Sequence, residues 1–213
     1  MMALSIILFS GGMDTKYSDI KPVLPQGILL STFGVLLTTI FTGFFIYWIS
    51  GFSNVSITMS LMTAMLLAAT MSSTDSASVF NILRSQSMNL KHNLRPMLEL
   101  ESGSNDPFAY MLTVIVLSFM KGENSVGQMV YSIAAQIVFG VLIGFLIALG
   151  AVWFMKHFTF NTSGFDAAFV LGVAVLAYAL PTLVGGNGYL SAYIVGIVWE
   201  IRNINNKNHL YIF

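Results

Sequence analysis

Long apolar runs alternate with short polar segments along the 213 residues of the chain. A helix needs about 20 apolar residues to cross the ~30 Å hydrocarbon core of a membrane. The runs show none of the roughly ten-residue segments of alternating polarity that are typical of membrane strands. We therefore predict six membrane crossings, all of them helical, over residues 26–48, 56–83, 96–120, 126–155, 165–184 and 189–199.

A shorter apolar run opens the chain, at residues 1–12. About 10 helical residues span roughly 15 Å, which is half of the hydrocarbon core. No basic segment precedes the run, so it does not resemble a secretory signal peptide. We expect it to be the end of a helix whose first part is missing, and we expect the chain to be truncated at both ends.

The composition agrees with a membrane protein. Hydrophobic residues make up 56% of the chain and charged residues 8%, against about 45–50% and about 25% in soluble domains. We therefore expect an integral membrane protein surrounded by lipid. The 9 basic and 9 acidic residues balance, so net charge does not indicate a nucleic-acid partner, and we expect none. The chain has no cysteine, which excludes disulfides and thiolate metal sites within it.

The basic residues predict an orientation, because cytoplasmic loops of membrane proteins are enriched in Lys and Arg. Alternating the six crossings places loops 13–24, 84–95 and 156–163 and the C-terminus on one side, with only Lys121 opposite. We predict that this richer side is cytoplasmic. Its eight basic residues are Lys16, Lys21, Arg84, Lys91, Arg95, Lys156, Arg202 and Lys207.

Three acids occur close together at the start of the run 96–120, at Glu99, Glu101 and Asp106. Asp106 lies about 15 Å from Pro96 along a helix, which is near the middle of the membrane. An ionisable group at that depth is costly and is a functional-site hypothesis by default. Ser102, four residues earlier, lies on the same helix face. Asn105 places a neutral amide beside the acid.

Pro107 follows the acid directly and cannot donate a backbone hydrogen bond. We expect the carbonyl of Gly103 to be freed for a cation or water, and Gly103 to add local flexibility. The alternative is that Glu99 and Glu101 only favour the N-terminal dipole of a helix, where Ser102 is a cap. That alternative leaves Asp106 unexplained.

A second polar cluster interrupts the run 56–83 at residues 72–78. Unwound segments between half helices form the ion sites of several secondary transporters. Ser73 and its neighbouring hydroxyls can satisfy freed backbone groups, while Thr74 and Asp75 offer oxygen ligands to an alkali cation. In a regular helix these hydroxyls would instead bond carbonyls of the preceding turn, but that leaves Asp75 unexplained. We predict that Asp75 and Asp106 belong to one ion site.

Other polar residues carry weaker signals. We expect Gln136 to form an interhelical hydrogen bond, Asp166 to begin a helix and Asn187 to occupy a turn. The three histidines lie in loops without the spacing of metal ligands. Small residues at helical spacing permit close approach of a second helix, and they are Gly140, Gly144, Ala148 and Ala151.

The motifs at 72–80, Ser-Ser-Thr-Asp-Ser-Ala-Ser-Val-Phe, and at 100–107, Leu-Glu-Ser-Gly-Ser-Asn-Asp-Pro, resemble those of the sodium/hydrogen exchanger superfamily. Among its monovalent cation/proton antiporters, the wording is most similar to the bacterial potassium/proton branch, which Pro107 also fits. Residues 7–15 and 188–193 match as well. The resemblance implies an all-α membrane bundle with inverted repeats and crossed, broken helices, of which residues 1–213 form a partial transmembrane domain.

The resemblance also implies roles for the site residues. Asp106 alternately binds the cation and the proton, and Asn105 is its neutral companion in electroneutral exchange. Thr74 and Asp75 complete the site at the helix break. Ser102 contributes an oxygen, Glu101 pairs with an arginine of a later helix that this chain lacks, and Ser73, Gly103 and Pro107 support the site.

The implied function is antiport of K⁺ or Na⁺ against protons, without a further cofactor. Burial raises the pKa of a carboxyl group and a nearby cation lowers it, so one carboxylate can make the two ligands exclusive. We expect a homodimer in a bacterial inner membrane.

Three alternatives remain open beside antiport. An intramembrane aspartyl protease would use Asp75 and Asp106 as its dyad, but the Gly-x-Gly-Asp pattern of such enzymes is replaced by Gly-Ser-Asn-Asp. For this reason we do not expect an enzyme. A cation channel would need a filter loop, which the sequence does not suggest. A non-functional fragment of an antiporter is the third alternative.

Overall fold

The computed structural model describes residues 2–52, 58–85, 90–122, 126–158 and 165–204. All regular elements within these ranges are helices, and this confirms the all-α membrane fold. In chain order they are α1 (Met2–Asp14), α2 (Tyr17–Ile20), the 3₁₀ turn η1 (Lys21–Val23), α3 (Leu24–Leu29), the π-helical turn η2 (Leu30–Gly34), α4 (Val35–Ser50), α5 (Leu61–Met71), α6 (Ser76–Ser85), the 3₁₀ turn η3 (Lys91–Asn93), α7 (Leu94–Lys121), α8 (Val126–His157), α9 (Phe165–Leu183) and α10 (Gly188–Ile204).

The predicted crossings correspond to these helices, with two corrections at their ends. Residues 13–24 were expected to form a polar loop, but α2 and η1 lead directly into α3. Pro22 and Pro25 each lie at the start of such an element, where the missing N–H costs nothing. Within the loop predicted at 84–95, Arg84 and Ser85 end α6 and α7 begins at Leu94, while residues 86–89 lie outside the described residues.

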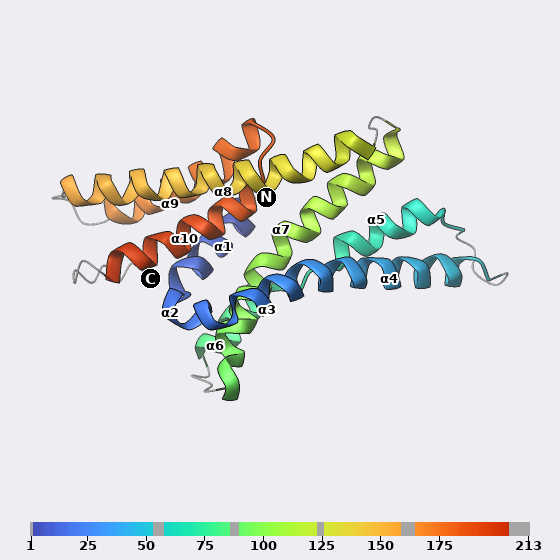
Figure 1. The fold of residues 1–213 in the computed structure, drawn as a ribbon, viewed down its shortest axis with the longest axis horizontal. Coiled ribbons are helices and arrows are strands. Elements are labelled where there is room, and N and C mark those ends of the chain that lie inside the picture. Colours follow the sequence, from blue (N-terminus) through green and yellow to red (C-terminus); the bar gives the residue numbers. More distant parts are fainter. Residues whose placement is uncertain (1, 53–57, 86–89, 123–125, 159–164, 205–213) are drawn as a thin grey trace.

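The helices form two groups that meet along α7 (Figure 1). In one group, α10 packs against α1, α8 and α9. In the other, α5 packs between α4 and α7, and α6 packs on α7. A buried apolar cluster fills the first group, and its members include Phe9, Ala148, Ala174, Val195 and Trp199. A second cluster joins α1, α6, α7 and α10, and it includes Leu8, Phe80, Leu100, Tyr189 and Tyr193.

Small residues set the close approach of α8 and α10, as the spacing predicts. A Cβ atom on Gly140 would lie 2.9 Å from the carbonyl oxygen of Asn187. A Cβ on Gly144 would lie 2.9 Å from Ser191 Oγ and 3.0 Å from its Cα and carbonyl oxygen. One turn further on, Ala148 is fully buried. The backbones therefore touch where larger side chains would hold the two helices apart.

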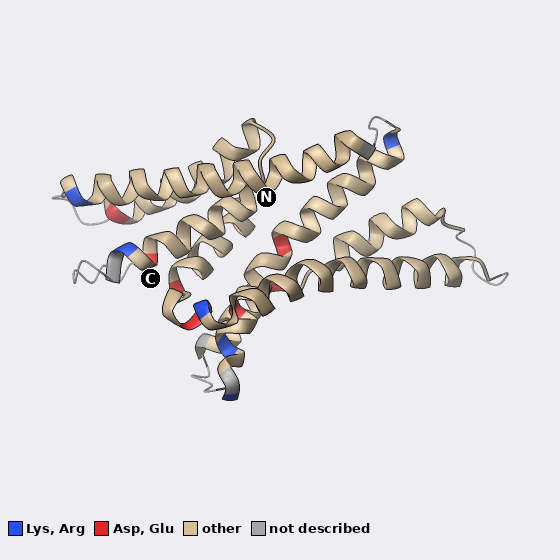
Figure 2. Ribbon diagram, in the orientation of Figure 1, with Lys and Arg blue, Asp and Glu red and all other residues tan. Residues whose placement is uncertain are grey.

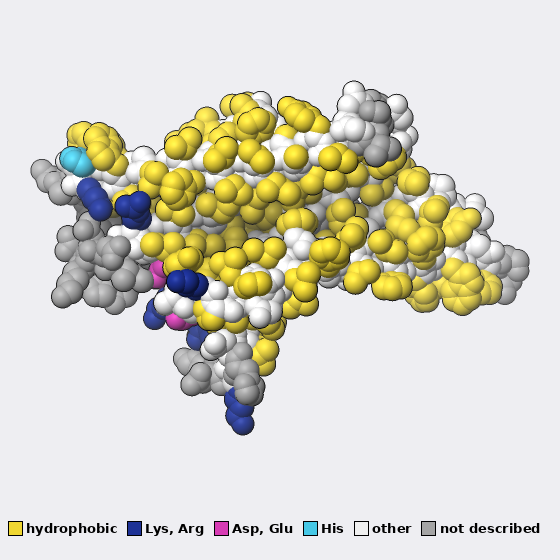
Figure 3. Space-filling view, viewed as in Figure 1, with side chains coloured by type: hydrophobic (Ala, Val, Ile, Leu, Met, Phe, Trp, Pro, Cys, Tyr) yellow, Lys and Arg dark blue, Asp and Glu magenta, His cyan; other side chains and the backbone are white. Residues whose placement is uncertain are grey.

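The outer surface suits a lipid environment. Three helical segments of the described residues are long and apolar enough to cross a membrane: Tyr17–Ser50, Gly127–His157 and Phe165–Leu183. Apolar side chains cover most of the face in Figure 3, with the charged ones gathered at one edge. Figure 2 shows Lys and Arg near helix ends. Lys121 ends α7 and Arg95 lies near its start, so the described part of the chain separates these two charges by the length of the helix.

We expect Gly144→Ala to lower the thermal stability of the protein in detergent, because the new methyl group would press on the backbone of Ser191. Overpacking of this kind costs about 1–3 kcal/mol. Gly150→Ala is the matched control, since it lies on the same helix with no other atom within 4 Å of its new Cβ. Equal melting temperatures for the two variants would contradict the close α8–α10 contact.

Candidate functional site

The predicted interruption of the run 56–83 is confirmed, since α5 ends at Met71 and α6 begins at Ser76. Both ends of the break are capped by serine or aspartate side chains. Ser72 Oγ donates to the carbonyl of Ala69 at 2.8 Å. The carboxylate of Asp75 accepts from Ser78 Oγ at 2.6 Å and from the Ser78 N–H at 3.3 Å. The capping side chains therefore bond the backbone groups that are freed at the end of α5 and at the start of α6.

Asp106 lies in the middle of α7, on the helix that passes the break. The helix has 28 residues, so it is about 42 Å long, and Asp106 lies about 18 Å from Leu94. The helix begins two residues before Pro96, and Asp106 lies the predicted distance of about 15 Å beyond that proline. Figure 2 shows acidic residues along the first half of α7.

Two serines hold the carboxylate of Asp106, one within the break and one at the start of α6. Ser73 Oγ donates to Oδ1 of Asp106. Ser76 Oγ donates to Oδ2 at 2.6 Å, and Ser76 is buried at 2% exposure. Both carboxylate oxygens thus accept a hydrogen bond from outside α7, which compensates for the removal of the acid from water.

Asn105 extends this network on the neighbouring side of α7. Its Nδ2 donates to Thr74 Oγ1 at 2.5 Å and to Glu101 Oε1 at 3.1 Å. Its Oδ1 accepts from Ser73 Oγ at 3.2 Å. The hydroxyls of Thr74 and Ser102 lie 3.2 Å apart. The structure therefore bonds three predicted site residues, Ser73, Thr74 and Glu101, to Asp106 or to its neighbour Asn105. Ser102 joins them through Thr74.

Asp75 is the predicted site residue that the network leaves out. Its carboxylate turns toward Ser78 and is exposed, and no hydrogen bond among the described residues joins it to Asp106. The reason is its position directly before α6, where an acid bonds the free N–H groups of the first turn. The contact that sequence reasoning missed is Ser76, which it included in the polar cluster but not among the site residues. The only sequence signal for this contact is the position of Ser76 directly after the capping residue Asp75.

Gly103 and Pro107 also contact α10 and the residue that precedes it. The helix α7 continues through both residues. A Cβ on Gly103 would lie 2.6 Å from the ring of Tyr193. Its lack of a side chain therefore lets α10 pack against the helix that carries Asp106. The carbonyl of Pro107 accepts a hydrogen bond from Asn187 Nδ2 at 2.9 Å.

Asn187 does more than occupy a turn, as it was predicted to do. It is fully buried, and its Oδ1 accepts from the N–H groups of Tyr189 and Leu190 at 3.0 and 3.1 Å, which caps α10. Its own N–H donates to the carbonyl of Gln136 at 3.0 Å. The interhelical bond expected of Gln136 is thus made by its main chain. With its bond to Pro107, Asn187 joins α7, α8 and α10 one residue from Asp106.

The two glutamates of α7 lie in different surroundings. Glu99 forms an ion pair with Arg95 at 3.0 Å, one turn earlier on the same helix. Glu101 is half-buried beside a cavity of about 230 Å³ between η2, α4, the break and the start of α7. Thr38, Ser72 and Thr74 also line this cavity. The cavity is therefore lined in part by polar residues, among them Thr74 of the candidate site.

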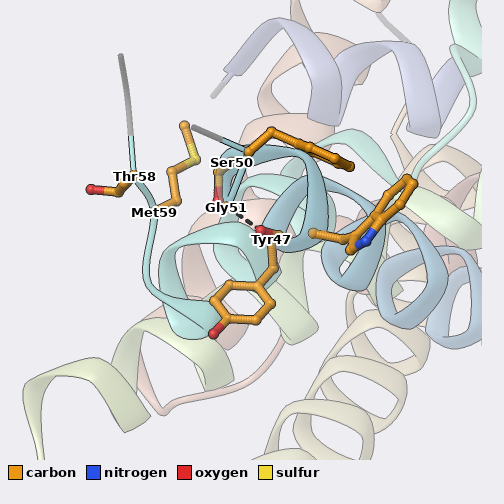
Figure 4. A pocket seen from close by; sticks show the side chains of 7 residues that line it. Tyr47, Ser50, Gly51, Thr58 and Met59 are labelled. Carbon is orange, nitrogen blue, oxygen red and sulfur yellow. Dashed lines mark hydrogen bonds between the residues drawn. The ribbon is translucent and has the colours of Figure 1, made fainter. Parts of the chain in front are cut away.

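A larger pocket lies at the other end of α4 and has a different character. Its volume is about 420 Å³, and it is lined by Tyr47, Trp48, Ser50, Gly51, Phe52, Thr58 and Met59 (Figure 4). No carboxylate lines it, so we do not assign it to ion binding. Within the described residues there is also no group of three or more His, Cys, Asp or Glu side chains suited to a metal ion. The oxygen network at Asp106 remains the candidate site.

Comparison with known proteins places these features in a family. Residues 1–211 match the family described as sodium/hydrogen exchanger, transmembrane. The K(+)/H(+) antiporter NhaP2 of Shewanella oneidensis is 35% identical over 202 residues, which cover 92% of this chain and 33% of that protein. The K(+)/H(+) antiporter NhaP of Alkalimonas amylolytica is 32% identical over 212 residues, covering 99% and 35%. The chain therefore spans about a third of the length of these relatives.

A solved structure shows the same fold. The sodium proton antiporter MjNhaP1 from Methanocaldococcus jannaschii, determined at pH 8, superposes with a TM-score of 0.74 at 22% identity. The match covers 95% of this chain and 48% of that one.

We expect Asn187→Ala to lower the melting temperature of the protein, because the change removes the α10 cap and the donor to Pro107 together. Loss of a cap costs about 1 kcal/mol and loss of a buried hydrogen bond about as much again. Asn187→Asp keeps the cap oxygen but turns a carboxylate toward the Pro107 carbonyl, so it is expected to be destabilised as well. A stable Asp variant would show that only the cap matters.

Proposed function

The chain belongs to the transmembrane family of sodium/hydrogen exchangers, and on this premise we propose that it exchanges K⁺ or Na⁺ for protons, with Asp106 as the shared carboxylate. The relatives named above are antiporters, so this is a family of transporters and not of enzymes. Because the chain covers about a third of those relatives, the proposal concerns the whole expressed protein.

The observation that carries the proposal is the hydrogen-bonding state of Asp106. It is an acid in the middle of a membrane helix, and both of its oxygens are held by hydroxyl groups that can also offer lone pairs. A proton on one carboxylate oxygen and an alkali cation on the same carboxylate exclude each other by charge. Transport of one ligand in each direction follows if the two sides of the membrane reach the site in turn.

The neighbours of Asp106 suit a monovalent cation. Asn105, Thr74 and Ser102 supply neutral oxygens near the carboxylate of Asp106, while the carboxylate of Glu101 joins the network only through Asn105. Hard cations prefer oxygen ligands, and one carboxylate balances one positive charge. We therefore propose one-for-one, electroneutral exchange, and we place the alkali cation at Asp106 with Asp75 acting on it by charge from outside the network.

The setting of the site extends the proposal. The Shewanella and Alkalimonas relatives are named for K⁺ and H⁺, which favours a bacterial inner membrane and K⁺ as one substrate. We place loops 13–24, 84–95 and 156–163 and the C-terminus in the cytoplasm, because they hold eight of the nine basic residues. We also propose a homodimer for the whole protein, as was expected from the family resemblance. No cofactor beyond the transported ions enters this mechanism.

We expect Asp106→Asn to reduce cation-dependent proton flux to the level of vesicles without the protein, because an amide cannot exchange a proton for a cation. Dequenching of a pH-sensitive dye in everted vesicles measures the flux. Asp19→Asn, an exposed acid of α2, is the control and should keep normal flux. Normal flux in the Asp106 variant would disprove the assignment of the carrier.

We expect Asp75→Asn to raise the apparent KM for the cation about threefold to tenfold, since an anion near the site attracts cations without contact. Asparagine caps a helix as well as aspartate does, so the break should remain intact. Asp166→Asn, an acid in the first turn of α9, is the matched control. If the KM is unchanged, Asp75 has only the capping role that its bonds to Ser78 describe.

A further inference from the structure

Three acceptor oxygens converge on the hydroxyl of Ser73. They are Oδ1 of Asp106, Oδ1 of Asn105 at 3.2 Å and the main-chain carbonyl of Thr74 at 3.1 Å. A serine hydroxyl carries a single proton. It can satisfy one of these acceptors well at any moment, and the other two then face an oxygen atom without a proton between them. The Ser73 hydroxyl therefore occupies a place that a positive charge would fill better.

The surrounding contacts fix these acceptors in place. The amide of Asn105 is oriented because its Nδ2 already donates to Thr74 and Glu101, so its Oδ1 must face Ser73. Asp106 is held through its other oxygen by Ser76. Asn105 is almost fully buried, at 1% exposure. Neither α7 side chain can turn away from Ser73 without breaking these bonds.

Ser73 itself is the member that can move. It lies within the break at residues 72–75, outside both half helices, and it is half-buried. Rotation about its χ1 would carry the hydroxyl out of the oxygen cluster while the three acceptors stay in place. The space it leaves is that of one oxygen atom, which a dehydrated alkali cation can also occupy.

We propose that Ser73 is an internal competitor of the transported cation: its hydroxyl occupies the oxygen cluster of Asp106, Asn105 and Thr74 in the empty carrier and leaves when a cation binds. The inference rests on the proposed function. It assigns to Ser73 a specific effect on cation affinity, distinct from general support of the site. Loading then exchanges one hydrogen-bond donor for one cation, and unloading restores the donor.

The test measures the apparent KM for K⁺ and Na⁺ in everted vesicles of the whole expressed protein. Ser73→Ala removes the competitor, so we expect the KM to fall about fivefold, the equivalent of ~1 kcal/mol. Ser73→Thr keeps the hydroxyl and should restore the normal KM. Ser72→Ala is the matched control in the same break, because its hydroxyl bonds the carbonyl of Ala69.

If the alanine variant no longer transports, a second measurement tests its cation binding without transport. Bound cation stabilises the folded protein by mass action, so the K⁺ concentration that raises the melting temperature in detergent reports binding directly. We expect Ser73→Ala to need about fivefold less K⁺ than the unchanged protein. If the alanine variant does not fold, Ser73→Cys, with its weaker donor, replaces it and should shift in the same direction.

The outcomes separate the inference from the function on which it rests. A KM for Ser73→Ala that rises would make Ser73 a ligand, and an unchanged KM would make it a structural residue. Either result overturns the competitor role. If those results occur while Asp106→Asn is inactive, only this inference fails. If Asp106→Asn transports normally, the proposed function fails, whatever the Ser73 variants show.

Discussion

A buried carboxylate must be held by hydrogen-bond donors, and at Asp106 these donors come from outside its own helix, from the break before α6 and from the first residue of α6. Within a regular helix, serine hydroxyls bond carbonyl groups of the preceding turn. Ser73 lies in the break and Ser76 begins α6, so neither has that preceding helical turn, and both donate to the acid. The break and the packing of α7 beside it together meet this requirement.

The group of helices that contains α10 supports the site from a neighbouring side of α7. Tyr193 of α10 lies against Gly103, and Asn187 bonds the carbonyl of Pro107. Tyr110 and Tyr189 add an edge-to-face ring contact at 5.2 Å between centroids. The position of Asp106 is therefore set by packing on one side and by hydrogen bonds on the other.

The sequence predicted what depends on composition and local pattern. Apolar runs located the helices, and the polar cluster at 72–78 located the break. The direction of each side chain depends on contacts between distant parts of the chain, which a local sequence pattern does not predict. The charge of Asp75 predicts a place in the ion site, and the structure adds its capping bonds to Ser78. The packing of Gly103 depends on Tyr193, which lies ninety positions further along the chain. The bond of Asn187 to Pro107 joins residues eighty positions apart, so the sequence predicts only its place in a turn.

The π-helical turn at Leu30–Gly34 joins α3 to α4 beside the cavity that contains Glu101. Such a turn accommodates one residue more than an α-helix does. Each helical residue advances the side chains by about 100°, so the turn shifts the phase of everything that follows it. Removal of one residue here would rotate the aromatic end of α4 to new neighbours while leaving the length of the crossing almost unchanged. An insertion or deletion at this turn would therefore rotate the α4 side chains that line the cavity, Val35 and Thr38, without a substitution at either position.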